Sequence, residues 1–298
     1  MGFGETVHIV PLGFEFDRVI KVLEKLRPNR VFLLVTPPDP KYPKEMNDKQ
    51  QYFNKRVEEK LKQFNIKVKF VEVDIFDMFK VTNAVAKLIL EEGGPDGKGS
   101  EIYVNMSAAG KLTSIGTTLA VMAIRGTLAA KAERTRLSER THLPSVYYVF
   151  ADGYSQGKKE EMEHGLSICN GSETIPLPNF QIETLDERLL RVLAFLAKSN
   201  EEEAVTIDDI IAFMIEQKDK RFKDAKSVVA NTKPKPNPKE EREIKRITTQ
   251  ENINNLNRGI LKKLKENGYI GTKKDGKYSR IWITESGKFA VAMNGLLD

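Results

Sequence analysis

The segment TVHIVPLGFEFDRVIKVLEKL, residues 6–26, passes from an apolar run through a glycine turn into a helix-like stretch. Residues 7–11 are almost continuously apolar, as strands covered on both faces tend to be. Gly13 permits a tight turn after this run. Apolar residues then recur with the spacing of one buried helical face, at Val19, Ile20, Leu23 and Leu26. This strand–turn–helix order is typical of an α/β domain.

The same alternation continues to about residue 150. Further apolar runs predict strands at residues 31–35, 68–73, 102–105 and 146–150. Stretches with helical apolar spacing lie between them, at residues 52–64, 81–90 and 112–140. Segments rich in proline or glycine, residues 36–44 and 91–100, indicate loops. Because strands that alternate with helices form right-handed crossovers, we expect a doubly wound, mainly parallel, Rossmann-like sheet.

The chain is 298 residues long, which is enough for two domains of ordinary size. We expect an α/β domain over residues 1–179 and a second domain over residues 180–298, with a proline-containing connector at residues 173–184. No apolar run has membrane-spanning length, and the single cysteine, Cys169, can form neither an internal disulfide nor a zinc site. We therefore expect a cytoplasmic, metal-free protein with no cofactor and no membrane partner.

Positive charge is concentrated in one segment of the second domain. Residues 218–280 hold 19 Lys/Arg and 8 Asp/Glu, a net charge of +11, whereas the rest of the chain holds 29 basic and 34 acidic residues. Such a concentration is what a phosphate-backbone partner requires. Residues 218–245 also carry three alternating prolines, Pro234, Pro236 and Pro238, which cannot lie inside a helix. We expect a basic, extended or mobile insertion at residues 218–245.

Helices are predicted on both sides of this insertion. Residues 185–197 and 206–216 have helical apolar spacing, the second with Thr206 as N-cap and Asp209 three residues later. A third helix is expected at residues 249–267, closed by Gly268. Its apolar positions share one face and are Ile253, Leu256, Ile260, Leu261 and Leu264.

A hairpin and a last helix follow. Strands are expected at residues 269–272 and 278–284, around a basic tip with an Asp-Gly turn at residues 273–277. We expect Trp282 to be a core residue of the return strand rather than a residue that stacks on a base. The last helix is expected at residues 285–296.

Helix, basic hairpin and helix in this order resemble the winged helix-turn-helix of many prokaryotic repressors. The resemblance rests on Leu261-x-x-Leu264-x-x-x-Gly268-Tyr269-Ile270 and on Ile281-Trp282-Ile283-Thr284-Glu285-Ser286-Gly287. In such a module the polar face of the third helix enters the major groove of double-stranded DNA, and the wing reaches phosphates or the minor groove. The candidate DNA-binding residues are Asn254, Asn255, Arg258, Lys262, Lys273, Lys274, Lys277 and Arg280. Winged helices also serve as dimerisation or protein-docking modules, but the charge of +11 favours DNA.

Two loops of the first domain have the composition of a ligand site. We name residues 11–17 the first loop and residues 105–113 the second loop; each follows a predicted strand. Ligands of open α/β sheets bind outside the carboxyl ends of the strands. Small residues in the second loop allow close approach to the backbone, and a helix beginning near Lys111 would direct its N–H groups to the same point, as in an anion site.

The Pro-x-Gly-Phe turn of the first loop and the Asn-x-Ser-small-small-Gly-Lys turn of the second resemble the signature loops of CRISPR-associated Rossmann-fold (CARF) domains. With the winged helix, the whole chain is similar to archaeal CARF–winged-helix transcriptional regulators of CRISPR antiviral defence. The resemblance implies a homodimer that binds a cyclic oligoadenylate in a two-fold pocket. The ligand-binding residues it implies are Gly13, Phe14, Asn105, Ser107, Gly110, Lys111 and Thr113.

The hypothesis that follows is a ligand-responsive, DNA-binding transcriptional regulator. An alternative is a metal-independent ring nuclease, in which Ser107 and Lys111 orient the 2′-hydroxyl of the cyclic ligand and stabilise charge on its phosphate. The second loop carries Ala108-Ala109-Gly110 where the CARF pattern has two glycines and a threonine. A repressor that responds to an unrelated nucleotide or metabolite therefore also stays open.

Overall fold

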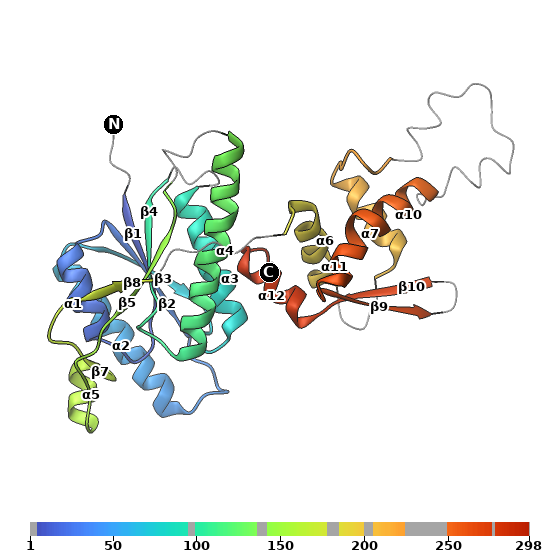
Figure 1. Cartoon of the computed structure of the whole chain (residues 1–298). Coiled ribbons are helices and arrows are strands. Elements are labelled where there is room, and N and C mark those ends of the chain that lie inside the picture. The colour runs from blue at the N-terminus through green and yellow to red at the C-terminus, as the bar shows by residue number, and fades with distance from the viewer. Residues whose placement is uncertain are drawn as a thin grey trace, which may run out of the picture. The chain divides into compact units, whose positions relative to one another are not determined.

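A six-stranded sheet forms the centre of the first of two units in the computed structural model (Figure 1). The structure describes residues 5–94, 99–135, 142–177, 185–199, 205–223, 249–275 and 278–297. The sheet order is β3-β2-β1-β4-β5-β8, with β3 and β8 at its edges. The strands are β1 (Thr6–Pro11), β2 (Arg30–Val35), β3 (Lys67–Glu72), β4 (Glu101–Asn105), β5 (Ser145–Val149) and β8 (Thr174–Pro176). β1 to β5 are parallel and β8 is antiparallel to β5, which confirms the predicted mainly parallel, doubly wound sheet.

Four helices cover the two faces of this sheet (Figure 1). They are α1 (Asp17–Leu26), α2 (Lys44–Gln63), α3 (Met78–Gly93) and α4 (Lys111–Thr135). Because side chains alternate along a strand, Val7 and Ile9 of β1 pack with α3 and α4, whereas Val10 packs with α1 and α2. The unit therefore has one apolar core on each face of the sheet.

The expectation that no apolar run has membrane-spanning length is wrong for α4, which is long and apolar enough, by length and composition, to cross a membrane over Lys111–Ala129. In the structure 67% of this stretch is buried within the protein, on the sheet and against α3. A buried core helix of an α/β domain can have the same length and apolar composition as a membrane-spanning helix.

Several boundaries differ from those expected. α2 begins at Lys44 rather than near residue 52. Its first two turns are polar, so the apolar spacing from which the helix was predicted starts only later in the segment. α3 extends to Gly93, into the expected loop at residues 91–100. A β6–α5–β7 excursion, with β6 (Gly153–Tyr154), α5 (Lys158–His164) and β7 (Ser167–Ile168), was not expected, nor was β8 inside the predicted connector.

The second unit has the order of a winged helix. Its elements are α6 (Glu187–Lys198), α7 (Ile207–Glu216), α10 (Gln250–Leu256), α11 (Lys262–Glu266), β9 (Ile270–Asp275), β10 (Tyr278–Ile283) and α12 (Glu285–Met293). The chain folds into two compact units. One consists of Met1–Thr184 with Ala292–Leu296, and the other of Leu185–Val291 with Leu297–Asp298. The predicted capping box is present, since the Thr206 Oγ1 accepts from the Asp209 N–H while the Asp209 carboxylate accepts from the Thr206 N–H. Gly268 has a φ of 71°, as expected of a glycine that ends a helix.

Five of the described residues link the segment that follows α7 to α10. The Asn252 side chain accepts from the Lys223 N–H over 3.2 Å and donates to the Lys223 carbonyl over 3.1 Å. The Asn255 amide donates to the Arg221 carbonyl over 2.8 Å, and the Lys223 ammonium lies 3.0 Å from the Glu251 carboxylate. We name Arg221, Lys223, Glu251, Asn252 and Asn255 the turn clamp. Of the predicted insertion at residues 218–245, only residues 218–223 lie in the described part of the chain.

Candidate functional site

The first loop and the second loop meet at the carboxyl ends of the neighbouring strands β1 and β4. The Gly13 N–H donates to the Ala108 carbonyl over 2.8 Å. A Cβ at Gly13 would lie 3.3 Å from that carbonyl oxygen and 3.4 Å from the Ala109 Cα, so a larger residue would force the two loops apart. The structure thus brings the predicted residue Gly13 into contact with the second loop.

Three of the predicted ligand-binding residues are buried and bonded inside the protein. The Asn105 Oδ1 accepts from the Ser107 N–H over 2.9 Å and from the Ser107 Oγ over 2.6 Å. The Ser107 Oγ in turn accepts from the Val149 N–H over 3.1 Å. The Thr113 Oγ1 donates to the Ile75 carbonyl over 2.6 Å. These side chains hold the second loop in shape rather than offering polar atoms to solvent.

We name Phe14, Gly110 and Lys111, the remaining predicted residues with accessible surface, the rim residues. Gly110 and Lys111 are exposed, and Phe14 is half-buried. A Cβ at Gly110 would have no heavy-atom neighbour within 4 Å. α4 begins at Lys111, so its first backbone N–H groups lie beside Gly110 and Lys111. The Lys49 ammonium lies 4.6 Å from the centre of the Phe14 ring and forms an ion pair with Glu161. The rim residues offer an aromatic ring, open backbone and positive charge.

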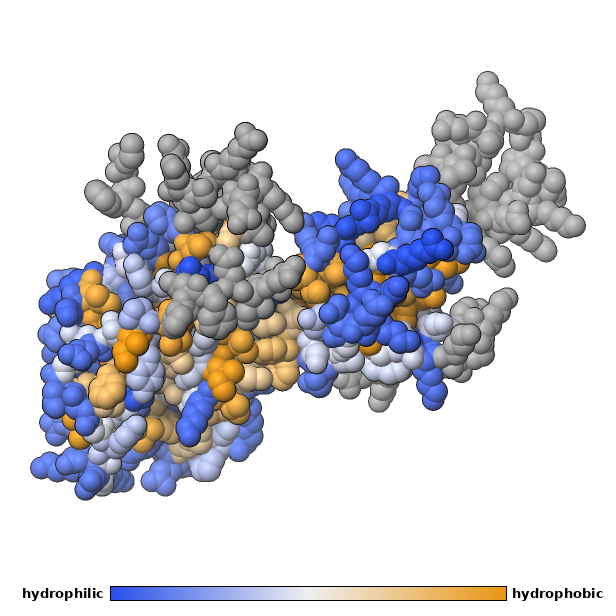
Figure 2. All heavy atoms as spheres, viewed as in Figure 1, coloured by the Kyte–Doolittle hydropathy of each residue, from blue (hydrophilic) through white to orange (hydrophobic). Residues whose placement is uncertain are grey.

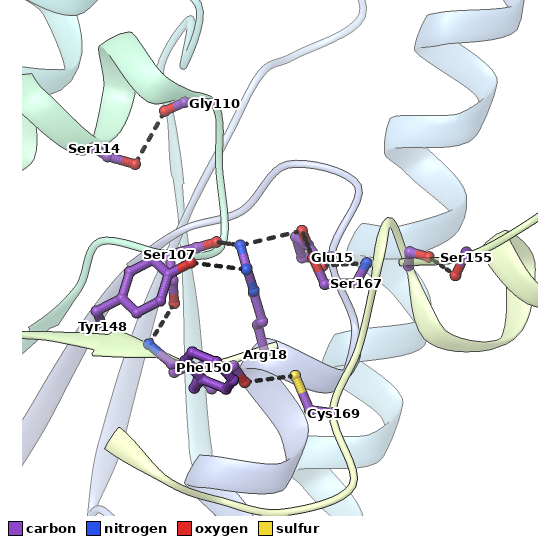
Figure 3. A network of polar contacts seen from close by, with 12 residues as sticks. Glu15, Arg18, Ser107, Gly110, Ser114, Tyr148, Phe150, Ser155, Ser167 and Cys169 are labelled. Atoms are coloured by element: carbon purple, nitrogen blue, oxygen red, sulfur yellow. Dashed lines mark hydrogen bonds and ion pairs between the residues drawn. The ribbon is translucent and has the colours of Figure 1, made fainter. Parts of the chain in front are cut away.

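Arg18 is a buried cation below the second loop that the sequence analysis did not single out (Figure 3). Its Nη1 donates to the Ser107 carbonyl over 3.0 Å, and its Nη2 donates to the Tyr148 Oη over 3.0 Å. The guanidinium carbon lies 5.2 Å from the centre of the Tyr148 ring. The Asn105 Nδ2 donates to the Arg18 carbonyl over 3.1 Å. Arg18 therefore ties α1 to the second loop and to β5.

Two buried carboxylates hold β7 and the residue after it, and one of them, Glu15, lies 3.7 Å from the Arg18 Nη1 (Figure 3). Glu15 accepts from the Ser167 N–H over 3.1 Å and from the Ser167 Oγ over 2.8 Å. Asp17 accepts from the Cys169 N–H over 3.1 Å. Burial raises the pKa of Glu15, although the Ser167 hydrogen bonds and the Arg18 charge act in the opposite direction. Burial also raises the pKa of Cys169 to about 11, so this thiol stays protonated and is no nucleophile at neutral pH.

The sequence does carry one signal for this buried network. Glu15, Asp17 and Arg18 stand at the beginning of an amphipathic helix, where charged residues are usually solvated. Arg18, however, precedes the buried Val22 by one helical turn and so shares its face. A charged residue on the apolar face of a helix is therefore the sequence signal that indicates the buried Arg18.

A polar face runs along the third helix of the winged helix. Asn254, Arg258 and Lys262 are exposed. The residues on the opposite face are buried and are Leu256, Ile260, Leu261 and Leu264. The predicted continuous helix is interrupted by a π-helical turn, Asn257–Leu261, between α10 and α11. Figure 2 shows a largely hydrophilic surface over α10 and α11. Asn255, predicted to contact DNA, is half-buried in the turn clamp.

The wing differs from expectation at one residue. Lys273 and Arg280 are exposed and lie directly opposite each other on β9 and β10. Lys277 lies outside the described residues, as does the side chain of Lys274. The prediction that Trp282 belongs to the core is wrong, because its side chain is 43% exposed. Side chains alternate along a strand, so the burial of Ile281 turns Trp282 to the outer face.

The solved structures that are similar to this chain at low sequence identity include the following three. Csm6 from Enterococcus italicus, bound to cyclic hexa-2′-fluoro-hexa-dAMP, is 14% identical with a TM-score of 0.38, over 76% of this chain and 53% of that chain. Can2 from Sulfobacillus thermosulfidooxidans, in complex with cyclic tetra-adenylate (cA4), is 12% identical with a TM-score of 0.31, over 96% and 63%. Protein VC1899 from Vibrio cholerae is 14% identical with a TM-score of 0.31, over 98% and 66%. The present chain thus spans between half and two thirds of the length of these structures. No curated protein matches it.

Two family models match the chain, each over one part of it. Residues 6–134 match the model described as HFX_2341_N-like, N-terminal, which extends from β1 into α4 and includes both loops. Residues 188–295 match the DUF6293 C-terminal winged helix domain, which extends from α6 through α12. One matched region therefore lies in the Rossmann-like α/β unit and the other in the winged-helix unit, and each is shorter than half of the chain.

Proposed function

We propose that this protein is a ligand-responsive, DNA-binding transcriptional regulator of the cytoplasm. A homodimer would bind a cyclic oligoadenylate between its two α/β domains, and binding would change the affinity of its two winged helices for pseudo-palindromic DNA. The coarser statement, a sensor domain joined to a DNA-binding domain, follows from the architecture. The ligand class rests on the resemblance of the two loops to those of CARF domains.

The observation that carries the DNA-binding half is the polar face of the third helix. Asn254, Arg258 and Lys262 are exposed along one side, while the apolar side is buried in the domain core. Arginine and asparagine are the side chains that form paired hydrogen bonds with guanine and adenine in the major groove. The net charge of +11 over residues 218–280 adds the attraction to phosphates.

DNA binding is tested by its dependence on salt. We expect the affinity for a duplex to fall by a factor on the order of 100 or more between low and moderate salt, because bound lysines and arginines release counterions. Arg258→Ala should weaken binding about tenfold, whereas Lys21→Ala, an exposed lysine of α1, should not. An affinity that stays constant as salt rises would contradict this half of the proposal.

The sensor half is supported by the rim residues of the two loops. Phe14 of the first loop keeps accessible surface, and Gly110 and Lys111 are exposed at the beginning of α4, a helix of 25 residues. An aromatic ring can stack on a base, and the helix N-terminus with Lys111 suits a phosphate.

The ligand is tested by thermal stability. A ligand that binds only the folded protein raises its melting temperature. We expect a rise with one cyclic oligoadenylate in a panel that also contains cyclic dinucleotides and ATP. The rise should be lost in Lys111→Ala and kept in Lys21→Ala. A panel without any shift would leave the architecture standing and direct the search to other metabolites.

Of the two residues named for the ring-nuclease alternative, Ser107 and Lys111, only Lys111 has an accessible side chain. The Ser107 hydroxyl donates to Asn105 and accepts from Val149, so its hydrogen-bonding groups are engaged inside the protein. Linear oligoadenylate formed on incubation, and lost in Lys111→Ala, would favour cleavage. Cleavage that continues unchanged in this variant would exclude Lys111 from it.

A further inference from the structure

Lys49 of α2 lies against the first loop, beside a residue that the sequence predicts to bind the ligand. Its ammonium is 4.6 Å from the centre of the Phe14 ring. The side chain of Lys49 is 22% exposed, and Phe14 is half-buried. Gly13, the residue before Phe14, is in contact with the second loop. The accessible ring of the first loop therefore has a cation next to it that comes from α2 rather than from either loop.

The ammonium of Lys49 already has an anionic partner inside the protein. It forms an ion pair with the carboxylate of Glu161 in α5, a side chain that is 27% exposed. The two residues are 112 positions apart in the chain, so the pair joins α2 to the β6–α5–β7 excursion. An ion pair that keeps contact with water contributes little to stability. Exchange of the Glu161 carboxylate for another anion would therefore cost the fold little.

Other contacts hold the end of α5 whether or not this ion pair is formed. Arg56, which follows Lys49 in α2 by about two turns, donates from its Nη1 to the Met162 carbonyl and, over 2.6 Å, to the Glu163 carbonyl. The Tyr52 hydroxyl donates to the same Met162 carbonyl over 3.1 Å. The carboxylate that pairs with Lys49 can thus move away by a change of side-chain rotamer while α5 stays in place.

The backbone after α5 holds the first loop directly. Gly165 has a φ of 86°, and a Cβ there would lie 2.7 Å from the Glu15 Cα and 2.8 Å from the Phe14 carbonyl oxygen. The close approach therefore requires glycine at this position. The Leu166 N–H donates to the Phe14 carbonyl over 2.8 Å. Because these backbone contacts fix the first loop, the ion pair between α2 and α5 is not needed for that purpose.

We propose that Lys49 is a ligand-binding residue of the sensor site and that Glu161 occupies it until an anionic ligand binds. A phosphate of a ligand next to Phe14 would replace the Glu161 carboxylate on the Lys49 ammonium. Glu161 would thereby set the affinity of the site, because the ligand binds only the fraction of the protein in which Lys49 is available. The inference rests on the proposed sensor function, since it takes the two loops as the ligand site.

The two charges predict opposite effects on ligand binding. Titration calorimetry would measure the binding of cyclic tri-, tetra- and hexa-adenylate to the full-length protein. For the ring that binds, Glu161→Gln should raise the affinity about fivefold, because no carboxylate has to be displaced. Lys49→Ala should lower the affinity about tenfold, through loss of a charge-assisted hydrogen bond. The double variant should bind as weakly as Lys49→Ala, since the removal of Glu161 helps only where Lys49 is present.

Control variants separate this site from folding and from a general effect of charge. Lys62 and Glu58 form an ion pair within α2 itself. Glu58→Gln therefore removes a carboxylate from a comparable pair and should leave the affinity unchanged. Lys49→Arg keeps the positive charge and should retain most of the affinity. Circular dichroism and thermal unfolding would verify that each variant is folded.

Inorganic tripolyphosphate tests the anion site independently of the ligand class. At constant ionic strength we expect it to raise the melting temperature of Glu161→Gln more than that of the wild type or of Glu58→Gln. This gain should be lost in the double variant without Lys49.

The outcomes distinguish the two proposals. If a cyclic oligoadenylate binds the wild type and binds folded Lys49→Ala and Glu161→Gln equally well, the role of Lys49 is refuted and the sensor proposal stands. If no cyclic oligoadenylate binds but tripolyphosphate stabilises Glu161→Gln selectively, the proposed ligand class is wrong and the anion site at Lys49 stands. If neither probe binds in the expected way, both the ligand class and the anion site are refuted.

Discussion

Burial shifts the pKa values of two titratable residues of the first unit in opposite directions. His8 of β1 is 1% exposed, lies 3.0 Å from the Tyr147 hydroxyl through its Nδ1, and stacks on Tyr103. Burial lowers the pKa of His8 to about 4. Burial instead raises the pKa of Glu15. In both residues the buried charged form is disfavoured, so His8 is neutral at neutral pH and Glu15 holds its proton to higher pH than an exposed glutamate does.

We expect stability to fall in acid because of His8. Its pKa in the folded protein, about 4, is below its ordinary value of 6.5, so the unfolded chain takes up this proton first as the pH falls. The stabilisation is complete above about pH 6.5 and is lost as the pH falls to about 4, by roughly 3 kcal/mol. Denaturant unfolding of the wild type and of His8→Gln across this range would measure it.

The comparison isolates His8, because Glu15 is present in both proteins and its contribution cancels. The free energy of unfolding of the wild type, relative to that of His8→Gln, should decline as the pH falls. A relative free energy that stays level from neutral pH to about pH 4 would show that His8 does not titrate in this way.

Among the elements, the turn clamp links the segment after α7 to α10 through side chains of the described residues. Asn252 is fully buried and makes two hydrogen bonds to the Lys223 backbone, and Asn255 holds Arg221. Phe222, which lies between Arg221 and Lys223 in the chain, is buried in the domain core. The ends of α7 and α10 are therefore joined by side chains as well as by the chain itself.

Replacement of residues 224–248 by about six Gly/Ser residues should leave the winged helix folded, since the clamp stays intact. We expect its stability to change by less than about 1 kcal/mol, because a change in the length of a connecting segment alters mainly its closure entropy. Asn252→Ala, in contrast, should cost about 2 kcal/mol. Asn252→Asp is the matched control, since it keeps the acceptor for the Lys223 N–H and loses the donor. Unfolding of the shortened protein would show that the clamp alone does not hold the turn.

Local signals were enough to predict most of the elements. The five parallel strands are short apolar runs, and the capping box and Gly268 mark helix ends by their own chemistry. The β6–α5–β7 excursion has no such signal, because it is held by contacts far along the chain, such as Glu15 with Ser167 and Lys49 with Glu161.

The candidate sites could be predicted only in outline. The sequence located both loops, but it did not separate side chains that hold a loop, such as Ser107, from those at its rim, such as Lys111. A hydrogen bond to a distant strand decides between these roles, and Ser107 has one with Val149. Trp282 was misplaced because a tryptophan in an apolar strand is usually buried, whereas the alternation set by Ile281 turns it outward.

At the scale of the whole molecule, the two units have separate apolar cores. One unit packs helices on both faces of the sheet, and the other packs α6, α7, α10 and α11 with the wing. Separate cores predict separate unfolding transitions. Tryptophan emission follows only the second unit, through Trp282, whereas circular dichroism follows both. We expect the two probes to give different midpoints in urea, and coincident curves would indicate that the units unfold as one cooperative body.

The edges of the sheet bear on how the protein avoids unwanted assembly. β3 exposes Lys67 and Lys69 along one edge, and β8 ends in Pro176, which has no N–H to donate to a further strand. Charged and proline-bearing edges oppose the addition of strands from other chains. Sheet extension, the route by which open sheets grow into fibrils, is therefore blocked at both ends. We therefore expect any dimer of this domain to form through its helices and loops.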